Sequence, residues 1–491
     1  MPQPIHPPTR PQSATPSAHQ SETTARLKIS LQFLGAAHCV TGSKYLLTLD
    51  QGHSQQQLMI DCGLFQGLKE LRLRNREPLP LAPADLEAVV LTHAHIDHSG
   101  YLPKLVQDGF QGPIFCTAAT ADLLEIMLLD SAKLQEEEAA YANAKGYSKH
   151  HPALPLYTVA DAKRVLPLLR PVPFDEPIAV TEQVTATFRG AGHILGAAIV
   201  ELSVRGQEQT KKLVFSGDLG RYDNPVLRDP TSVTEADVLL VESTYGDRDT
   251  RLQDPEAELA QVVNAALSTG GVLLIAAFAV GRTQTLLYYL RKLRAEGRVP
   301  QVPVYVDSPM GIRVTELYPR HPDDHRLGDG NVFDFPGVRF VAEQQESKSL
   351  NDVSGPAIII SASGMCTGGR IVQHLYHRLS RPQDTLLLIG YQAEGTRGRS
   401  LQQGQTAIKM FGEMVPVRCH VAELDGMSAH ADRSELLRWL GNFKVAPKHT
   451  FVVHGEPAAA TALAETLRQN RGWPNVVVPN FLESVVLFDG L

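Results

Sequence analysis

The sequence has few cysteines, no long apolar segment and no excess of positive charge. Its five cysteines are spread over 491 residues without a Cys-x-x-Cys pair, so a disulfide framework is not expected and a reducing compartment is indicated. No apolar run reaches the roughly 18 residues that a membrane-spanning helix needs. These absences predict a cytoplasmic protein that has no membrane partner.

The missing positive charge is less informative than it first looks. The net charge of −7 disfavours a nucleic-acid partner when it is averaged over the chain. However, residues 247–422 carry 19 Lys and Arg against 18 Asp and Glu, whereas the rest of the chain carries 27 against 35. Some of that excess acid consists of candidate metal ligands, whose charge a bound metal would cancel. The average charge therefore does not decide the class of partner.

The pattern of apolar residues predicts an α/β fold. Residues 1–26 are rich in Pro, Ser, Thr and Gln and lack the apolar core of a secretory signal, so we predict a disordered tail. From Leu27 onward, short β segments alternate with amphipathic helices. Past residue 246 the strands become continuous apolar runs separated by helices, which predicts a parallel sheet covered on both faces.

These patterns give the expected elements and domains. Strands are expected at 44–49, 58–60, 88–91, 113–116, 184–188, 197–203, 213–216, 238–242, 272–276, 302–306, 357–360, 385–389 and 450–453, and helices at 101–107, 118–144, 283–295, 370–379, 432–440 and 458–469. Residues of metal-binding type stop near 242 and resume at 430. We therefore predict one domain, 27–246 and 423–491, interrupted by a second, 247–422.

The run Thr92–His98 is the strongest functional signal. It packs three imidazoles and one carboxylate into a few residues directly after the mostly apolar run Leu86–Leu91, as expected of a buried strand that ends in a tight loop. Imidazole and carboxylate ligands together suit a zinc-type divalent metal, and such a set also accepts manganese.

Four other predicted strands or turns also place an acid or a histidine where loops converge in α/β folds. These residues are Asp61, His193, Asp218 and His454. Taken singly, an aspartate at a strand end is more often a helix N-cap, and a histidine beside glycine is more often structural. Five occurrences of one pattern in one chain indicate a common site.

This ordered set resembles the metallo-β-lactamase superfamily, whose hallmark is His-x-His-x-Asp-His. Glu242 in Val-Glu-Ser-Thr-Tyr-Gly, His430 in Gly-Met-Ser-Ala-His-Ala-Asp and His454 in Val-His-Gly-Glu resemble the three extra motifs of the β-CASP nucleases. The resemblance covers residues 27–491. It implies a metallo-β-lactamase αββα sandwich interrupted by an inserted β-CASP α/β domain with a mainly parallel sheet.

The resemblance also implies a site with two zinc ions, in which manganese is an alternative. The implied ligands are His93, His95 and His193 for the first ion, Asp97, His98 and His454 for the second, and Asp218 as a bridge. Asp61 would accept a hydrogen bond from a ligand histidine and so orient it. His430 would be the general acid, paired with Glu242, with Asp97 also in the catalytic set.

The implied activity is RNA cleavage, because RNA-directed members have a histidine at the position of His454 and DNA-directed members lack it. Two metals can clamp a phosphodiester for in-line attack by water, and the products would carry a 5′-phosphate and a 3′-hydroxyl. Cleavage within the RNA and degradation from its 5′ end both remain open, and a homodimer is possible. The alternatives are a hydrolase of small thioesters, a DNA nuclease and an inactive scaffold.

Glycine and arginine residues in 247–422 resemble stretches that line the nuclease groove of the family. The implied RNA contacts are Arg282, Ser363, Gly364, Gly368, Gly369, Arg370 and Arg399. Arginine suits phosphate through its bidentate fork, but each of these arginines could instead form an ordinary ion pair. One departure from the family is the sequence Ala37–Gly42, where His38 and Cys39 stand in place of an Arg-Glu pair; a variant loop near the groove is expected there rather than a metal site.

Overall fold

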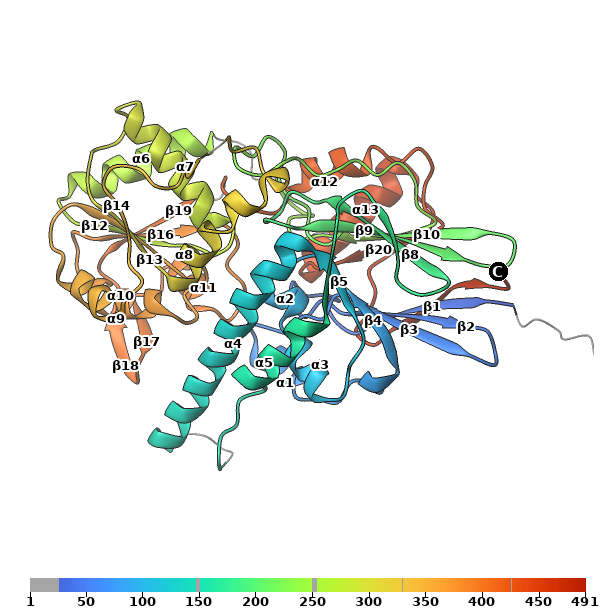
Figure 1. Cartoon of the computed structure of the whole chain (residues 1–491). Coiled ribbons are helices and arrows are strands. Elements are labelled where there is room, and N and C mark those ends of the chain that lie inside the picture. Colours follow the sequence, from blue (N-terminus) through green and yellow to red (C-terminus); the bar gives the residue numbers. More distant parts are fainter. Residues whose placement is uncertain (1–25, 147–150, 250–253, 329, 425) are drawn as a thin grey trace, which may run out of the picture.

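The computed structural model describes residues 26–146, 151–249, 254–328, 330–424 and 426–491. Three large sheets and one hairpin account for the strands of these residues (Figure 1). Apart from Arg26, the predicted N-terminal tail lies outside the described residues. No helix in the described part of the chain is both long and apolar enough to cross a membrane.

The first sheet has seven strands in the order β22-β1-β2-β3-β4-β5-β6. Its first half is antiparallel, and the pairs from β3 to β6 are parallel. The bounds are β1 (Lys28–Phe33), β2 (Tyr45–Asp50), β3 (Gln55–Ile60), β4 (Leu86–Val90), β5 (Ile114–Thr117), β6 (Leu169–Val172) and β22 (Ser484–Asp489).

The second sheet repeats this plan in the order β21-β20-β11-β10-β9-β8-β7. The pairs from β7 to β10 are antiparallel, and those joining β10, β11, β20 and β21 are parallel. The bounds are β7 (Pro177–Ala179), β8 (Val184–Gly190), β9 (Ala198–Arg205), β10 (Thr210–Phe215), β11 (Val238–Glu242), β20 (His449–Val453) and β21 (Val476–Val477).

The two sheets pack face to face around a shared apolar core. Inward-facing residues of both sheets, such as Leu31, Phe33 and Phe451, are fully or almost fully buried, and the rings of Phe33 and Phe451 lie 4.9 Å apart. Helices cover the two outer faces: α2 (Ile96–Ser99), α3 (Leu102–Gln107), α4 (Ala118–Lys145), α5 (Val159–Val165), α12 (Arg433–Leu440) and α13 (Pro457–Arg471). The short α1 (Lys69–Arg74) has no buried residue. The result is an αββα sandwich, as predicted.

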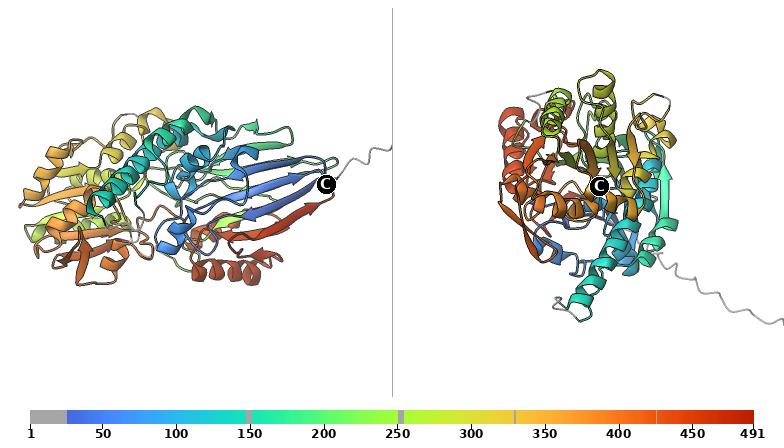
Figure 2. Two further views of the ribbon diagram at one scale, coloured as in Figure 1. Left: turned by 90° about the horizontal axis from the view of Figure 1, so that it is seen from below. Right: turned by 90° about the vertical axis from the view of Figure 1, so that its left-hand side faces the viewer.

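The third sheet forms a separate lobe at the opposite end of the molecule from the free ends of β1 and β2 (Figures 1 and 2). Its order is β14-β13-β15-β12-β16-β19 and every pair is parallel. The strands are β12 (Val272–Ala276), β13 (Val304–Asp307), β14 (Val338–Phe340), β15 (Ala357–Ser361), β16 (Thr385–Ile389) and β19 (His420–Leu424), and the hairpin pairs β17 (Ala407–Met410) with β18 (Glu413–Pro416).

Helices lie on both faces of the third sheet, because its central strands are buried on both sides. These helices are α6 (Pro255–Ser268), α7 (Arg282–Ala295), α8 (Pro309–Thr315), α9 (Gln344–Ser349), α10 (Arg370–Arg378) and α11 (Arg397–Gln402). Short 3₁₀ helices occur at Pro83–Asp85, Leu166–Leu168, Tyr318–Arg320, Pro322–Asp324 and Leu350–Asp352. The parallel, doubly covered sheet predicted past residue 246 is therefore confirmed.

Candidate metal centre

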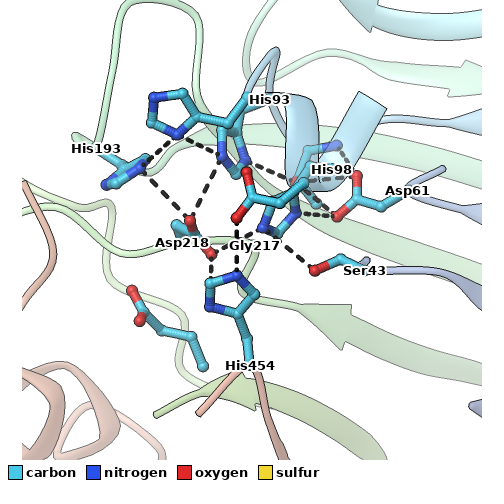
Figure 3. Close-up of polar contacts among 12 residues, drawn as sticks. Ser43, Asp61, His93, His98, His193, Gly217, Asp218 and His454 are labelled. Carbon is cyan, nitrogen blue, oxygen red and sulfur yellow. Dashed lines mark hydrogen bonds and ion pairs between the residues drawn. The ribbon is translucent and has the colours of Figure 1, made fainter. Parts of the chain in front are cut away.

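Side chains that can bind metal follow the carboxyl ends of parallel strands in both sheets of the sandwich. Asp61 follows β3 and His93 lies just beyond β4, while Asp218 lies just beyond β10, Glu242 ends β11 and His454 follows β20. The carboxyl ends of parallel strands meet at one edge of a sheet. Stacking the two sheets then brings Asp61, His93, Asp218 and His454 from distant parts of the sequence into one cluster (Figure 3). Glu242 lies with Asp218 and His454.

Three imidazole nitrogens and one carboxylate converge in a first group of possible ligands. His95 Nδ1 lies 3.2 Å from His93 Nε2 and 3.1 Å from His193 Nε2. Asp218 Oδ2 lies 3.5 Å from Nε2 of both His93 and His193. A tetrahedral ion with bonds of about 2.0–2.1 Å separates its ligand atoms by about 3.3 Å. The four atoms are therefore spaced as zinc ligands would be.

A second group shares Asp218 with the first. Asp97, His98 and His454 offer ligand atoms that all lie within 4.8 Å of one another. Asp218 Oδ1 lies 3.2 Å from His98 Nε2 and 3.6 Å from His454 Nδ1, so its two oxygens face different groups. This is the position that a bridging carboxylate would take.

Hydrogen bonds on the outer side of the rings fix how the histidines point. Asp61 Oδ2 accepts from His98 Nδ1 at 2.8 Å, and the carbonyl of Ala429 lies 3.3 Å from His193 Nδ1. Thr92 Oγ1, which donates to Asp61, lies 3.1 Å from His93 Nδ1. With Nδ1 engaged outward, the neutral rings of His93 and His193 present Nε2 to the cluster without a proton. Burial opposes protonation of His98, but the carboxylates of Asp218 and Asp61 raise its pKa well above the usual value.

These contacts suit a cation at the point where the rings meet. Unprotonated nitrogens about 3 Å apart present lone pairs to one another, which is repulsive unless a positive ion lies between them. Burial lowers the pKa of His95 to about 4 and those of His93 and His193 well below the usual value. The rings therefore stay neutral, which is the form that binds metal.

His430 and Glu242 stand beside the ligand groups as a separate pair. His430 Nδ1 lies 3.3 and 3.2 Å from the two carboxylate oxygens of Glu242 and 3.9 Å from Asp218 Oδ2. Glu242 is fully buried and also accepts from the backbone N–H of Leu219 and the hydroxyl of Thr244. Burial opposes protonation of His430, but the charge and hydrogen bond of Glu242 raise its pKa to about 9.

The cluster opens into a groove of about 1260 Å³ between the sandwich and the third sheet. His95, Asp97, His193, Asp218 and His430 line its floor. Further along, α4 forms one wall, and the loops that precede α7, α8 and α10 form the other. A chain-like molecule that reaches the histidine and aspartate cluster can therefore contact both lobes.

The three predicted RNA-binding arginines have different surroundings. Arg282 lines the groove and is 7% exposed, and among the described residues its Nε has no hydrogen-bond partner. Arg370 also lines the groove, but its guanidinium donates to Asp307 Oδ1 at 2.7 Å and to the carbonyls of Val341 and Ala342. The ion pair that the sequence left open as an alternative is thus present at Arg370.

Arg399 lies 3.6 Å from Glu394 and donates to Gln402 at 3.0 Å, and it is not among the residues that line the groove of the described structure. Of the predicted loop residues, Ser363, Gly368 and Gly369 line the groove. Gly364 instead packs under Phe278, where an added Cβ would come within 2.6 Å of the ring. Gly364 and Arg399 are therefore not placed on the groove, whereas Arg370 lines it with its guanidinium paired to Asp307. The phosphate roles of all three stay predictions.

The loop that departs from the family pattern lies at the mouth of the groove. Val40 and Thr41 line the groove, the thiol of Cys39 is buried against the carbonyl of Thr41, and His38 is exposed. Neither His38 nor Cys39 belongs to a possible metal-binding group of the described residues. The expectation of a variant loop near the groove fits this arrangement.

Comparisons with known proteins agree with this architecture. Residues 56–277 match the beta-lactamase superfamily domain, residues 283–401 the Beta-Casp domain, and residues 414–479 the Zn-dependent metallo-hydrolase RNA specificity domain. "Ribonuclease TTHA0252" of Thermus thermophilus is 38% identical over 442 residues, which cover 88% of this chain and 94% of that protein. The chain belongs to the β-CASP family of the metallo-β-lactamase superfamily.

Other members of the comparison are more distant. The "Transcription termination factor FttA" of Methanocaldococcus jannaschii is 30% identical to this β-CASP chain, over 90% of the chain and 69% of that protein. A solved structure of a protein of unknown function from Enterococcus faecalis aligns with a TM-score of 0.50 at 12% identity, covering 94% of this chain and 100% of that one. The second likeness concerns the fold alone. Together with the histidine and aspartate cluster, the family identifies the β-CASP chain as a metal-dependent hydrolase with a divalent metal site.

Some residues of the β-CASP site were not assigned a role from the sequence. Ser43 Oγ lies 3.3 Å from His98 Nε2, and Thr244 Oγ1 donates to Glu242 and lies 3.2 Å from His454 Nδ1. Thr92 and Thr244 both stand inside the motifs that named the site. The signal for them was present, because a hydroxyl next in sequence to a ligand histidine can accept from its outer N–H, and a hydroxyl close to an acid can donate to the carboxylate.

Proposed function

We propose that this chain is a ribonuclease that hydrolyses RNA phosphodiester bonds with two divalent metal ions. The observation that carries the proposal is the juxtaposition of two ligand groups, joined by Asp218, with the pair His430 and Glu242 on the floor of one groove. The relatives named ribonuclease and transcription termination factor support RNA as the substrate. His454, the residue expected of RNA-directed members, lies in the second ligand group.

In this proposal, zinc is the metal and manganese an alternative. His93, His95 and His193 would hold one ion, Asp97, His98 and His454 would hold the other, and Asp218 would contact both. When bound, such ions lower the pKa of water towards about 7 and neutralise charge on a phosphodiester. Asp61 keeps His98 oriented through the 2.8 Å hydrogen bond to Nδ1.

His430 would protonate the departing 3′ oxygen of the ribose, so that the products carry a 5′-phosphate and a 3′-hydroxyl. Its Nδ1 faces Glu242, which leaves the opposite nitrogen of the ring for the substrate. Because Glu242 favours the protonated ring, His430 holds the proton that the leaving group needs.

Arg282 is the residue best placed to contact a substrate phosphate. Its guanidinium is buried at the groove, and α7 begins at this residue behind Gly281, a glycine with a φ of 79°. The start of a helix favours an anion, and so does a guanidinium whose Nε has no hydrogen-bond partner among the residues that the structure describes. Ser363, Gly368 and Gly369 lie on the same wall of the groove and would approach the RNA through short side chains or backbone.

We also propose the predicted domain division, with one refinement. The sandwich would comprise 27–246 and the C-terminal part, and the β-CASP domain would begin at 247. β19 (His420–Leu424) pairs with β16 in the third sheet, so we place the return to the sandwich after Leu424 instead of after residue 422. A cytoplasmic location and a homodimer stay predictions.

The test uses four substrates with the metal-loaded protein: a linear single-stranded RNA, the same RNA closed into a circle, single-stranded DNA of the same sequence, and a thioester. Cleavage of linear RNA to products with a 5′-phosphate is expected, with little activity on DNA or thioester. Cleavage of the circle would show attack within the chain, and protection of the circle would show degradation from an end.

Preferential hydrolysis of the thioester or the DNA would contradict the proposal. Comparing RNAs with a 5′-monophosphate and a 5′-hydroxyl in the same assay tells whether the 5′ end is recognised. Asp218→Asn is the matched negative control, because it removes one charge from the shared ligand without changing side-chain size.

A further inference from the structure

Arg221 lies at the junction between the loop that carries Asp218 and the loop that carries His430. The Arg221 side chain is 7% exposed. Arg221 lies three residues after Asp218, in the loop that follows β10. Arg221 Nη2 lies 2.9 Å from Asp432 Oδ2, and Arg221 Nε lies 3.1 Å from Glu435 Oε2. One arginine therefore joins two buried carboxylates that belong to the start of α12.

Both carboxylates accept several hydrogen bonds besides the contact to Arg221. Asp432 is the N-cap of α12 and its Oδ1 accepts from the backbone N–H of Glu435 and the hydroxyl of Ser434. Glu435 accepts in return from the N–H of Asp432, and its Oε1 accepts from the N–H of Tyr222. Asp432 and Glu435 are 0% and 3% exposed. Buried charges of this kind need their partners to be held in place.

This cluster is continuous with the backbone that holds His430. Gly220 forms a β-bridge with His430, and the N–H of Ala431 donates to the carbonyl of Leu219 at 2.8 Å. An added Cβ at Gly220 would come within 1.9 Å of the carbonyl oxygen of Gly192, so the His193 loop presses on the same strand of backbone. Residues 219–221 are thus fixed between the His193 loop on one side and His430 on the other.

The imidazole of His430 is held at two points. Glu242 fixes Nδ1 of the ring, while the backbone of His430 and Ala431 is held by Gly220 and Leu219. Two residues after His430, Asp432 is anchored by Arg221. Replacing Arg221 would remove that anchor, whereas Glu242 and all seven implied metal ligands would still be present in the chain.

We propose that Arg221 is a positioning residue for proton donation by His430. The proposal rests on the proposed function, because it takes His430 to be the general acid. Arg221 acts through Asp432 and Glu435 to keep the His430 loop against residues 219–221, so that the ring meets the leaving oxygen at a fixed distance. The rate of proton transfer depends on where the His430 ring lies. Metal binding by His93, His95, Asp97, His98 and His193 does not depend on the position of that ring.

The test compares two substrates that differ in their need for a proton donor. RNA releases an alkoxide that must be protonated, whereas bis(p-nitrophenyl) phosphate releases a stable phenolate that leaves without a proton. In Arg221→Met we expect kcat on RNA to fall by about 10- to 100-fold, a part of the 10²–10⁴ that general acid catalysis contributes. Turnover of bis(p-nitrophenyl) phosphate and the metal content should stay within about threefold of the wild type.

A double variant shows whether Arg221 works through His430. If it does, adding Arg221→Met to His430→Ala costs no further activity on RNA. Arg438→Met is the matched control, because Arg438 is an exposed arginine on the same helix that packs over Tyr222; it should behave as wild type. If Arg221→Met does not fold, Asp432→Asn loosens the same pair while keeping an N-cap side chain, and the same pattern is expected with a loss of about 10-fold.

The proposal is overturned if Arg221→Met leaves RNA cleavage unchanged, lowers kcat equally on both substrates, or loses metal. It is also overturned if the double variant cleaves RNA more slowly than His430→Ala alone. These outcomes differ from failure of the proposed function, in which the wild-type protein itself would not cleave RNA. If the wild type cleaves RNA but Arg221→Met is impaired equally on both substrates, the proposed ribonuclease function is retained and the positioning role of Arg221 is rejected.

Discussion

The floor of the groove and its wall on the third-sheet side differ in how their polar and charged side chains are paired. On the floor, His93, His95, His193 and Asp218 converge on one another with distances of 3.1–3.5 Å between their nitrogen and oxygen atoms. On the wall, Arg370 is already neutralised by the buried Asp307. Arg282 lines the same groove, and its Nε has no hydrogen-bond partner in the described part of the chain.

The difference lies in what satisfies the buried groups. Aligned lone pairs on the floor require a cation from outside the protein, so their function can be inferred from their mutual positions. An arginine beside a buried carboxylate stabilises the fold, whereas an arginine without a carboxylate is free to bind a phosphate. Five substitutions, ordered by expected effect, test whether this division holds.

The largest effect is expected at Asp218, which touches both ligand groups. Asp218→Asn should lose metal and reduce RNA cleavage by a factor of about 10³ or more, because a shared carboxylate supports both ions. Metal content per chain and cleavage rate are the measurements. Asp175→Asn, in a surface pair with Arg189, is the control. Full metal content in Asp218→Asn would contradict the bridging position.

The next largest effect separates the proton donor from the metal floor. His430→Ala should keep both metals but lose most turnover on RNA, about 10²- to 10⁴-fold, because general acid catalysis contributes that much. Elemental analysis and single-turnover cleavage provide the comparison. An equal loss of metal in this variant would mean that His430 is a ligand instead of an acid.

Arg282→Met addresses the binding wall. Removing one phosphate contact should reduce the slope of log K against log salt for single-stranded RNA by about 0.7. The measurement is RNA affinity of metal-free protein at several salt concentrations. A slope equal to that of the wild type would place Arg282 outside the RNA contacts.

Arg370→Met is the matched comparison on the same wall, and here stability should change instead of the salt slope. Asp307 would lose one charged partner but keep His374 and Ser347. We expect the free energy of unfolding to fall by about 1–3 kcal/mol, measured by urea denaturation. An unchanged stability with a flatter salt slope would restore the phosphate role for Arg370.

Arg399→Met should have the smallest effect. Its partners Glu394 and Gln402 are near the surface, and exposed ion pairs contribute about 0–1 kcal/mol. Salt slope and unfolding free energy should both match the wild type within error. A clear change in the slope would mean that RNA reaches beyond the groove.

The sequence predicted strand bounds and metal ligands well, because the residues that determine them lie within recognisable motifs and apolar runs. The strands 272–276 and 385–389 were predicted with the observed bounds, and the implied ligands lie together because parallel strands end at a common edge. The role of Arg370 could not be predicted in this way, because its partner Asp307 comes 63 residues earlier and reaches it only through the third sheet.

Two causes account for other strands, helices and contacts that the sequence did not predict: pairing between distant parts of the chain, and the shortness of some helices. β1 was not among the predicted strands, and it pairs with β22 from the far end of the chain. Short helices such as α8, α9 and α11 carry too few residues for a clear apolar period. Arg221 went unassigned because its two partners follow more than two hundred residues later.

The parallel pairing of β11 with β20 has a consequence for the synthesis of the protein. Glu242 stands opposite Val453 in that pair, and His454 follows immediately. A ribosome must therefore add the whole of residues 243–448 before the strand that carries His454 can join the sheet. Until His454 is added the nascent chain holds an incomplete second ligand group, and until His430 is added Glu242 has no imidazole beside it. Any cleavage activity emerges late in translation, so the messenger RNA being read is close to a growing chain that cannot yet cut it.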